Sequence, residues 1–301
     1  MGDLLEFILP IATIDPEHEA VTQAQAWLAP QFHGGAVVEV SGFGPYGETD
    51  HAQVLLRGYL YDTPEHRRQV AAILQALPHR PLAEFYGEPR LNYLATADWA
   101  EVWKQHYHAM RIGEHVVISP QWEQPELGPD DVLIELEPGM AFGTGTHPST
   151  QLILRLLERY LPQKAVLLDV GTGSGILAIA AIKLGAGGVV ATDIDPDAVR
   201  TAQENAALNQ VLPDIDFAVG SVPASGVYPL VMANILADVL ADLLLHHHLS
   251  QRVAPGGILL LSGIIQQRRE VVDLALRVSG LTLIDVVEDG DWLAMAVRRE
   301  G

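Results

Sequence analysis

The spacing of apolar positions predicts alternating strands and helices in the first part of the chain. Short apolar runs are typical of strands, and apolar residues three or four positions apart are typical of helices. The resulting order is strand, helix, strand, strand, helix, strand, which predicts a small N-terminal α+β domain of the ferredoxin-like kind over residues 1–95. Its predicted elements lie at residues 4–12, 15–28, 36–40, 53–61, 63–77 and within 82–94.

Both predicted helices of this part begin with the same three kinds of residue: a capping side chain, a proline and an acid. Asp15-Pro16-Glu17 opens the first helix, and Thr63-Pro64-Glu65 opens the second. A capping oxygen accepts a free N–H group, proline fits the first helical position, and an acid suits the positive end of the helix dipole. Gly34-Gly35 predicts a turn before the strand that starts at Ala36.

The rest of the chain alternates strands with longer helices, which predicts a doubly wound α/β sheet. Asp98 is placed to cap a helix that carries Trp99 and Trp103 on one face, where they would pack between two domains. We therefore predict a linker and lead-in over 96–137 and an α/β domain over 138–301. Strands are expected at 116–120, 132–136, 166–170, 188–192, 215–219, 228–234, 258–262, 281–288 and 292–298, and helices at 176–184, 196–209, 238–249 and 266–278, with one more ending at 161.

The strongest chemical signal lies between a predicted buried strand and the helix that follows it. Asp169 stands near the end of the strand, and Gly171, Gly173 and Gly175 come next at alternate positions. Glycine lets the backbone turn tightly and approach a ligand, and a helix N-terminus offers free N–H groups. Asp193 closes the next strand, about 20 residues later, where an acid can accept hydrogen bonds from ribose hydroxyls. The spacing D-x-G-x-G-x-G differs from the dinucleotide fingerprint G-x-G-x-x-G. A glycine-rich turn without a ligand is the alternative.

A second glycine-rich loop, Pro138 to Thr150, comes just before this strand and feeds a helix. It combines glycines with threonine hydroxyls, which suits a loop that wraps a small ligand. His147 in this loop is a candidate proton acceptor. The alternative is that its ring only makes structural hydrogen bonds.

Charge and cysteine content narrow the function classes. The chain has 301 residues, no cysteine and a formal net charge of −20. Without cysteine there are no disulfides, thiolate nucleophiles or cysteine metal sites. A strongly acidic surface repels phosphate backbones, so we expect no direct nucleic-acid binding and favour a basic protein partner. The alternative is that the acidic charge only maintains solubility.

The sequence predicts neither a metal site nor a membrane segment. His246, His247 and His248 fan out around a predicted helix axis, so they would not converge on one metal ion. The N-terminal segment lacks the basic region of a signal peptide, and no apolar run is as long as a membrane helix. We therefore expect a cytoplasmic protein, and the sequence gives no prediction of its oligomeric state.

Four motifs together resemble those of the ribosomal protein L11 methyltransferase (PrmA) family of class I methyltransferases. The resemblance covers residues from about 96 to 301 and is limited to the order of elements before that. The Phe-Gly-Thr-Gly loop directly before this glycine-rich core is specific to that family among methyltransferases. The motifs are Pro138–Thr150, Leu168–Ala181, Asp193-Ile-Asp-Pro and Ala233-Asn-Ile-Leu-Ala.

The resemblance implies a cofactor, a substrate and a role for the first domain. The cofactor is S-adenosylmethionine, the methyl acceptors are amino groups of a basic ribosomal protein, and the N-terminal domain recognises that protein. A purely structural role for this domain is the alternative. The residues assigned to the cofactor, from the glycine-rich turn and from the resemblance, are Phe142, Thr150, Asp169, Gly171, Gly173, Asp193 and Asn234.

Asn234 is the candidate catalytic residue, because it ends a strand that should lie beside the strand of Asp169. Its amide oxygen could accept the hydrogens of the target amine and direct the nitrogen lone pair. A lysine has an ordinary pKa of about 10.4, and a neighbouring sulfonium lowers it, so no dedicated base is required. Asn234 could instead cap the next helix. The same core could also act on another protein, an RNA or a small molecule, or only bind the cofactor.

Overall fold

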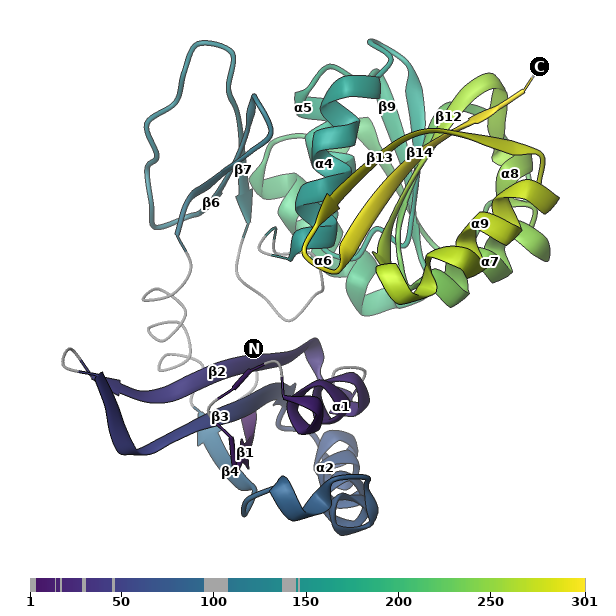
Figure 1. Cartoon of the computed structure of the whole chain (residues 1–301). Coiled ribbons are helices and arrows are strands. Elements are labelled where there is room, and N and C mark those ends of the chain that lie inside the picture. Colours follow the sequence, from purple (N-terminus) through teal and green to yellow (C-terminus); the bar gives the residue numbers. More distant parts are fainter. Residues whose placement is uncertain are drawn as a thin grey trace. The chain divides into compact units, whose positions relative to one another are not determined.

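The structure is a computed structural model that divides after Tyr107 into two compact units, each with its own sheet (Figure 1). The predicted domain boundaries, after residues 95 and 137, fall on either side of this division. The structure describes residues 4–13, 15–16, 18–28, 31–44, 47–94, 108–136, 145 and 147–300. The predicted helix with Asp98, Trp99 and Trp103 lies outside the described residues.

The first unit is a ferredoxin-like α+β fold with the sheet order β2-β3-β1-β4, which confirms the predicted class. β1 runs antiparallel to both of its neighbours. Its alternation places Leu5, Phe7 and Leu9 among the buried residues of the two helices, each at most 1% exposed. The elements are β1 (Leu4–Ile11), α1 (Glu19–Leu28), β2 (His33–Gly44), β3 (Gly47–Tyr61), α2 (Pro64–Ala76), the short 3₁₀ turns η2 (Leu77–His79) and η3 (Ala83–Phe85), and β4 (Arg90–Leu94).

The two helix starts of this unit differ in how well the sequence predicts them. Thr63 caps α2 as predicted, because its side chain accepts a hydrogen bond from the His66 N–H at 3.1 Å. The prediction for α1 is wrong, since this helix begins at Glu19, after the predicted cap and proline. There the N–H of Ala20 donates to Nδ1 of His18 at 3.1 Å, so His18 takes the capping role.

The turn predicted at Gly34-Gly35 is also wrong, because both glycines lie inside β2. The register of β2 against β3 shifts between His33 and Val37, so the strand carries an irregularity around the glycines. Glycine within a strand often marks such a bulge. The two glycines therefore mark an irregularity within the strand and not the start of the strand.

The second unit is a doubly wound sheet, as predicted, and its strand order is β10-β9-β8-β11-β12-β14-β13. The strands from β10 to β12 run parallel, and β14 lies antiparallel between β12 and β13. The elements are α4 (Pro148–Tyr160), β8 (Val166–Val170), α5 (Ile176–Lys183), β9 (Gly188–Asp193), α6 (Pro196–Leu208), η4 (Leu212–Asp214), β10 (Ile215–Val219), β11 (Tyr228–Asn234), α7 (Ala237–Leu245), α8 (Leu249–Arg252), β12 (Val253–Ile265), η5 (Gln266–Arg268), α9 (Arg269–Val278), β13 (Leu281–Asp289) and β14 (Trp292–Arg299).

Helices cover both faces of this sheet (Figure 1). α4, α5 and α6 pack on one face, and α7, α8 and α9 pack on the other. β8 shows how one strand serves both layers, because Leu167 packs with the first group of helices and Leu168 with the second, both fully buried. Burial on both faces explains why the central strands are continuous apolar runs in the sequence.

The helix predicted over 238–249 is interrupted at its histidines. α7 ends at Leu245, α8 begins at Leu249, and His248 between them has a left-handed φ of 59°. His247 pairs with Asp242 at 3.1 Å. Histidine is a modest helix former, and three in succession give the helix little reason to continue. Within the described residues, no group of His, Asp or Glu could hold a metal ion. None of the helices in that part of the chain combines the length and apolarity needed to cross a membrane.

Part of the predicted lead-in forms a small sheet of the second unit, with the order β5-β6-β7. Ile118 and Ile134 from this sheet are fully buried in the same cluster as α4 and α5. The small sheet is therefore packed on the larger one through shared helices. Its strands are β5 (Met110–Ile112), β6 (Val116–Pro120) and β7 (Val132–Leu136).

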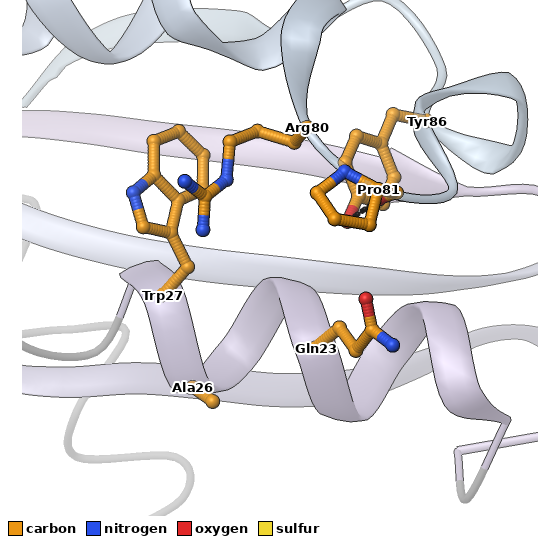
Figure 2. A pocket seen from close by; sticks show the side chains of 6 residues that line it. All are labelled: Gln23, Ala26, Trp27, Arg80, Pro81 and Tyr86. Atoms are coloured by element: carbon orange, nitrogen blue, oxygen red, sulfur yellow. Dashed lines mark hydrogen bonds between the residues drawn. The ribbon is translucent and has the colours of Figure 1, made fainter.

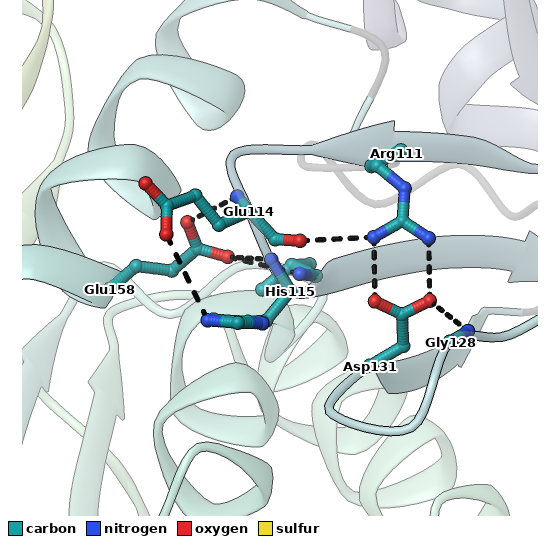
Figure 3. A network of polar contacts seen from close by, with 7 residues as sticks. Arg111, Glu114, His115, Gly128, Asp131 and Glu158 are labelled. Carbon is teal, nitrogen blue, oxygen red and sulfur yellow. Dashed lines mark hydrogen bonds and ion pairs between the residues drawn. The ribbon is translucent and has the colours of Figure 1, made fainter.

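A single carboxylate ties the small sheet to α4 (Figure 3), and we call this contact the Glu158 clasp. Glu158 accepts backbone N–H bonds from Glu114, His115 and Val116 at 2.8, 2.8 and 3.0 Å. Gly113, just before them, has a φ of +65°, and a Cβ there would lie 2.0 Å from Oε2 of Glu158. The turn between β5 and β6 therefore requires glycine at this position.

A forked ion pair braces the same sheet beside the clasp (Figure 3). Arg111 of β5 donates to both carboxylate oxygens of Asp131 at 2.6 and 2.5 Å. The Gly128 N–H donates to the same carboxylate at 2.6 Å. The bond from Arg111, followed by that from Gly128, lowers the pKa of Asp131 to about 2. Both side chains of this ion pair are therefore ionised at neutral pH.

Candidate functional site

The carboxyl ends of β8, β9 and β11 meet at one edge of the parallel sheet, and each carries a polar side chain there. β8 lies between the other two strands, and its Asp169 is directly opposite Met232 of β11. Asp169, Asp193 and Asn234 therefore stand on three neighbouring strands, close to their carboxyl ends. In open α/β sheets, ligands bind outside this edge.

The glycine-rich turn after β8 forms the floor of this edge. Gly171, Gly173 and Gly175 have φ values of 74°, 55° and 81°, all in the left-handed region that favours glycine. A Cβ on Gly171 would lie 3.0 Å from the Ile235 side chain, and one on Gly175 would lie 3.0 Å from Cβ of Ala202. The backbone conformation favours glycine at all three positions, and close packing adds to this preference at Gly171 and Gly175.

Asp169 is fully buried beneath the turn. Its Oδ2 accepts a hydrogen bond from the Thr172 hydroxyl at 2.7 Å. Burial raises the pKa of Asp169 to about 7, the nearby charge of Asp193 adds to the rise, and the bond from Thr172 opposes it. Near neutral pH the carboxyl group is thus poised between a neutral hydrogen-bond donor and a charged acceptor.

Asp193 at the end of β9 is fixed by the backbone around it. Its Oδ2 accepts the Gly173 N–H at 2.9 Å, and its Oδ1 accepts the Asp195 N–H at 3.0 Å. A carboxylate oxygen can accept more than one hydrogen bond, so both keep capacity for hydroxyl donors. The acid is therefore pre-oriented for the ribose contact that the sequence predicts.

Asn234 at the end of β11 contacts another residue predicted for the cofactor. Its Nδ2 donates to the Thr150 hydroxyl of α4 at 3.2 Å. The alternative that Asn234 caps the next helix is wrong, because α7 begins at Ala237 with Leu236 at the cap position. The Asn234 side chain is thus turned toward α4 and not toward α7.

The start of α4 is hydrogen-bonded to the same edge of the sheet. Ser262 of β12 donates its hydroxyl to the Ser149 carbonyl at 2.9 Å. His147 caps α4, because its Nδ1 accepts the Ser149 N–H at 3.2 Å, and its ring meets Trp292 edge-on at 4.4 Å. Burial lowers the pKa of His147, which favours the neutral ring that a cap acceptor needs. The structure thus gives His147 the structural role.

Phe142, which the sequence assigns to the cofactor, lies outside the described residues.

Three buried side-chain oxygens at this edge have no hydrogen-bond partner within the described part of the chain. They are Asp169 Oδ1, Thr192 Oγ1 and Asn234 Oδ1. A buried polar atom without a partner costs free energy, so each one calls for an explanation. S-adenosylmethionine carries hydroxyl and ammonium donors and a positive sulfonium, which are groups that such oxygens accept. The residues present therefore fit the cofactor that the motifs imply.

Sequence reasoning missed two residues that hold the turn in place. Asn205 of α6 donates from Nδ2 to the Ser174 carbonyl at 2.8 Å, and it is only 4% exposed. The Thr192 carbonyl accepts the N–H groups of Gly171 and Thr172 at 2.8 and 3.0 Å. Asn205 had a visible signal, because it is a polar residue on the apolar face of α6. Thr192 had none, since its carbonyl would look the same for any residue type.

Comparisons with known proteins agree with this geometry. The profile of the family described as ribosomal protein L11 methyltransferase (PrmA) matches residues 44–300. The family likeness thus starts earlier than the predicted residue 96. A ribosomal protein L11 methyltransferase from Chloroflexus aurantiacus is 40% identical over 95% of this chain and 96% of its own length. Another from Geobacter metallireducens is 44% identical over 79% of each chain.

A solved structure resembles part of this chain. The crystal structure of a ribosomal protein L11 methylase from Lactobacillus delbrueckii subsp. bulgaricus matches with a TM-score of 0.60 and 36% identity. The match covers 65% of this chain and 100% of the other. The sequence likeness and the structural likeness thus point to the same family. The chain belongs to the ribosomal protein L11 methyltransferase (PrmA) family, whose members are class I methyltransferases that use S-adenosylmethionine.

Proposed function

We propose that this chain transfers methyl groups from S-adenosylmethionine to amino groups of ribosomal protein L11. The observation that carries the proposal is the unpaired Oδ1 of Asn234 at the end of β11, beside the glycine-rich turn. A methyltransferase for amines needs an acceptor that aims the nitrogen lone pair, and this atom is an acceptor without a partner within the described residues. The names of the relatives give the substrate class.

The cofactor would be held on the β8–β9 side of the edge. Asp193 binds the ribose hydroxyls, Gly171 and Gly173 bring the backbone close to the ligand, and Asp169 lies beneath them. Thr150 of α4 would add a contact, and the family resemblance adds Phe142. When bound, S-adenosylmethionine supplies an electrophilic methyl group on a positive sulfonium. Most of the remaining work is orientation, which can contribute on the order of 7–11 kcal/mol.

Asn234 would act on the incoming amine. Its Oδ1 accepts a hydrogen of the neutral amine, while its Nδ2 is held by Thr150 at 3.2 Å. The fixed Nδ2 keeps the oxygen from rotating away, so the amine meets an acceptor in one orientation. Positive charge beside the amine favours loss of its proton to water, and no further base is required.

The first unit would recognise the protein substrate. Every residue that we assign to the cofactor lies after residue 137, which leaves the ferredoxin-like unit free for another task. The net charge of −20 suits a basic partner and disfavours a phosphate backbone. With a ribosomal protein as substrate, the enzyme would act in the cytoplasm.

The test offers the purified chain three acceptors together with S-adenosylmethionine labelled in its methyl group. The acceptors are ribosomal protein L11, ribosomal RNA and free lysine, each at the same concentration. We expect label in the protein alone, with intact-mass spectrometry showing additions of whole methyl groups. Asn234→Ala serves as the control and should lose the label. Label in RNA, or none in any acceptor with the parent chain, would contradict the proposal.

A further inference from the structure

A cleft of about 340 Å³ opens in the first unit between α1 and the 3₁₀ turns η2 and η3 (Figure 2). Gln23 and Trp27 stand one turn apart on α1, and Arg80, Pro81 and Tyr86 line the other side. None of them takes part in the proposed cofactor site. The α1 wall precedes residue 44, where the family profile begins to match.

Arg80 is the charged group of this cleft. The central carbon of its guanidinium lies 4.5 Å from the centre of the Trp27 ring. A guanidinium over an aromatic face keeps its N–H groups available at its edges, in the fork that matches a carboxylate. No ion pair in the described part of the chain includes Arg80, whereas Arg57 and Arg67 of the same unit pair with Glu6 and Asp62.

The other groups of the cleft are neutral or apolar. The Tyr86 hydroxyl already donates to the Pro81 carbonyl at 3.1 Å, and burial raises the pKa of Tyr86, so the phenol stays neutral. Trp27 and Pro81 present apolar surface to the same space. The cleft thus combines one positive fork with apolar walls, which suits a carboxylate carried on a short aliphatic stem.

We infer that this cleft binds an acidic side chain of the protein substrate, with its carboxylate on Arg80 and its stem against Trp27. The inference rests on the proposed function, because it takes a protein to be the substrate. The chain has 38 acidic and 18 basic residues, so general attraction brings a basic partner near but does not orient it. An ion pair between a positive residue of this chain and a negative residue of the substrate has the opposite polarity to that general attraction. Such a pair fixes the orientation of the bound substrate, because a wrong orientation leaves both charges without a partner.

An RNA phosphate could also meet a guanidinium, but the net charge of −20 of the chain disfavours binding of a phosphate backbone. A single acidic side chain brings only one negative charge close to the acidic protein, whereas an RNA strand brings one with every nucleotide. The size of the cleft agrees, since its volume suits one or two side chains and not a strand of nucleotides. The observations therefore favour an acidic residue of a protein.

The test compares Arg80→Ala with Arg68→Ala, which removes the same charge from an exposed position on α2 outside the cleft. Methylation rates are measured against the concentration of ribosomal protein L11. We expect Arg80→Ala to raise KM about tenfold or more with kcat within about twofold, as truncation of a buried arginine anchor does. Arg80→Lys should raise KM nearly as much, because lysine lacks the planar fork. Arg68→Ala should leave KM within about twofold, the usual range for an exposed charge.

Charge reversal then identifies the partner residue. Arg80→Glu should raise KM further, and one Asp→Arg or Glu→Arg substitution in the substrate should restore it. Trp27→Phe keeps an aromatic platform and should have a smaller effect than Arg80→Ala. Equal KM values for the Arg80→Ala and Arg68→Ala variants would overturn the inference, as would weaker binding of ribosomal RNA with unchanged KM for the protein. A parent chain that methylates no L11 would instead overturn the proposed function.

Discussion

The two halves of the sheet edge present different kinds of atoms to a ligand. On the β8–β9 half, backbone groups do most of the work, because the glycine turn is closed by the Thr192 carbonyl and Asp193 is held by two N–H groups. On the β11–β12 half, side chains bind side chains or carbonyls, as in the bonds of Asn234 and Ser262 to α4. In the first half, both carboxylate oxygens of Asp193 already accept backbone hydrogen bonds, while Asp169 Oδ1 and Thr192 Oγ1 are buried without a partner within the described residues. In the second half, the buried oxygen without such a partner is Oδ1 of Asn234, the last residue of β11.

This difference matches a division of labour. A carboxylate fixed by backbone donors offers the same contact to the ground state and to the transition state, so it contributes mainly to binding. An unpaired acceptor that is aimed at the reacting amine contributes mainly to the rate. The comparison therefore predicts opposite kinetic signatures for Asp193 and Asn234, and each experiment below can sharpen or break it.

The largest effect should come from Asp169 of β8, which is fully buried beneath the glycine-rich turn. Its pKa is about 7 in the folded chain and near 3.8 when exposed, so the folded state holds a proton that the unfolded state releases. Stability from this group is therefore complete below pH 4 and is lost as the pH rises through 7. Between pH 5 and pH 8, the cofactor-free chain should lose on the order of 3 kcal/mol relative to Asp169→Asn. Urea unfolding measures this difference, and parallel pH curves for the two proteins would contradict it.

Asn234→Ala should reduce the single-turnover transfer rate about a hundredfold or more, on the order of 3 kcal/mol, as loss of one oriented polar group does. Cofactor affinity, measured by calorimetry, should change much less. An equal fall in affinity and rate would place Asn234 with the binding half and break the comparison.

Asn234→Asp makes the same test with almost no change in size. The carboxylate attracts the protonated, unreactive amine and removes the Nδ2 donor that holds Thr150. We expect binding of substrate to persist while the rate falls about tenfold or more. A rate equal to that of the parent chain would rule out the aiming role.

Asp193→Ala should weaken cofactor binding by about 1–3 kcal/mol, the cost of removing a charged acceptor from bound hydroxyls. Turnover at saturating cofactor should be nearly unchanged. Asp197→Ala is the matched control, because it removes an exposed acid from the start of the next helix. Calorimetry that shows equal affinities for both variants would remove the ribose assignment.

The smallest effect should come from the Glu158 clasp, which lies outside both halves. Glu158→Gln exchanges a charged acceptor of three N–H bonds for a neutral one, and the site is partly exposed. We expect a loss of about 1 kcal/mol of unfolding free energy and unchanged cofactor affinity. The control is Glu204→Gln on the exposed face of α6, which should be neutral. A lowered cofactor affinity would mean that the small sheet supports the edge directly.

The sequence predicts the β8–β9 half well, because its information is local. Asp169, the glycines and Asp193 lie within one strand–helix–strand unit, and left-handed glycines leave a direct mark in the sequence. The doubly wound class was also accessible, since short buried strands alternate with helices in the sequence. The break after α7 could not be predicted in this way. The apolar spacing continues across the histidines at 246–248, whereas the helix ends there.

The β11–β12 half is harder to predict, because its contacts join residues far apart in the chain. Asn234 could be placed from topology, but its bond to Thr150 spans 84 positions and the bond from Ser262 to Ser149 spans 113. No spacing rule connects such positions. The cleft of the first unit is a stronger case, since Trp27 and Arg80 meet only after two separate elements have packed.

β14 lies between β12 and β13, although it follows both in the chain. During synthesis, residues 253–265 therefore wait for residues 292–299 before their second neighbour exists. Until then β12 offers an open edge lined by Leu259 and Leu261, which are fully buried in the finished fold. An apolar open edge is a template for pairing with another chain. Translation thus delivers the ligand-facing strands first, and the last hairpin decides whether the nascent sheet closes on itself or is captured by a neighbouring chain.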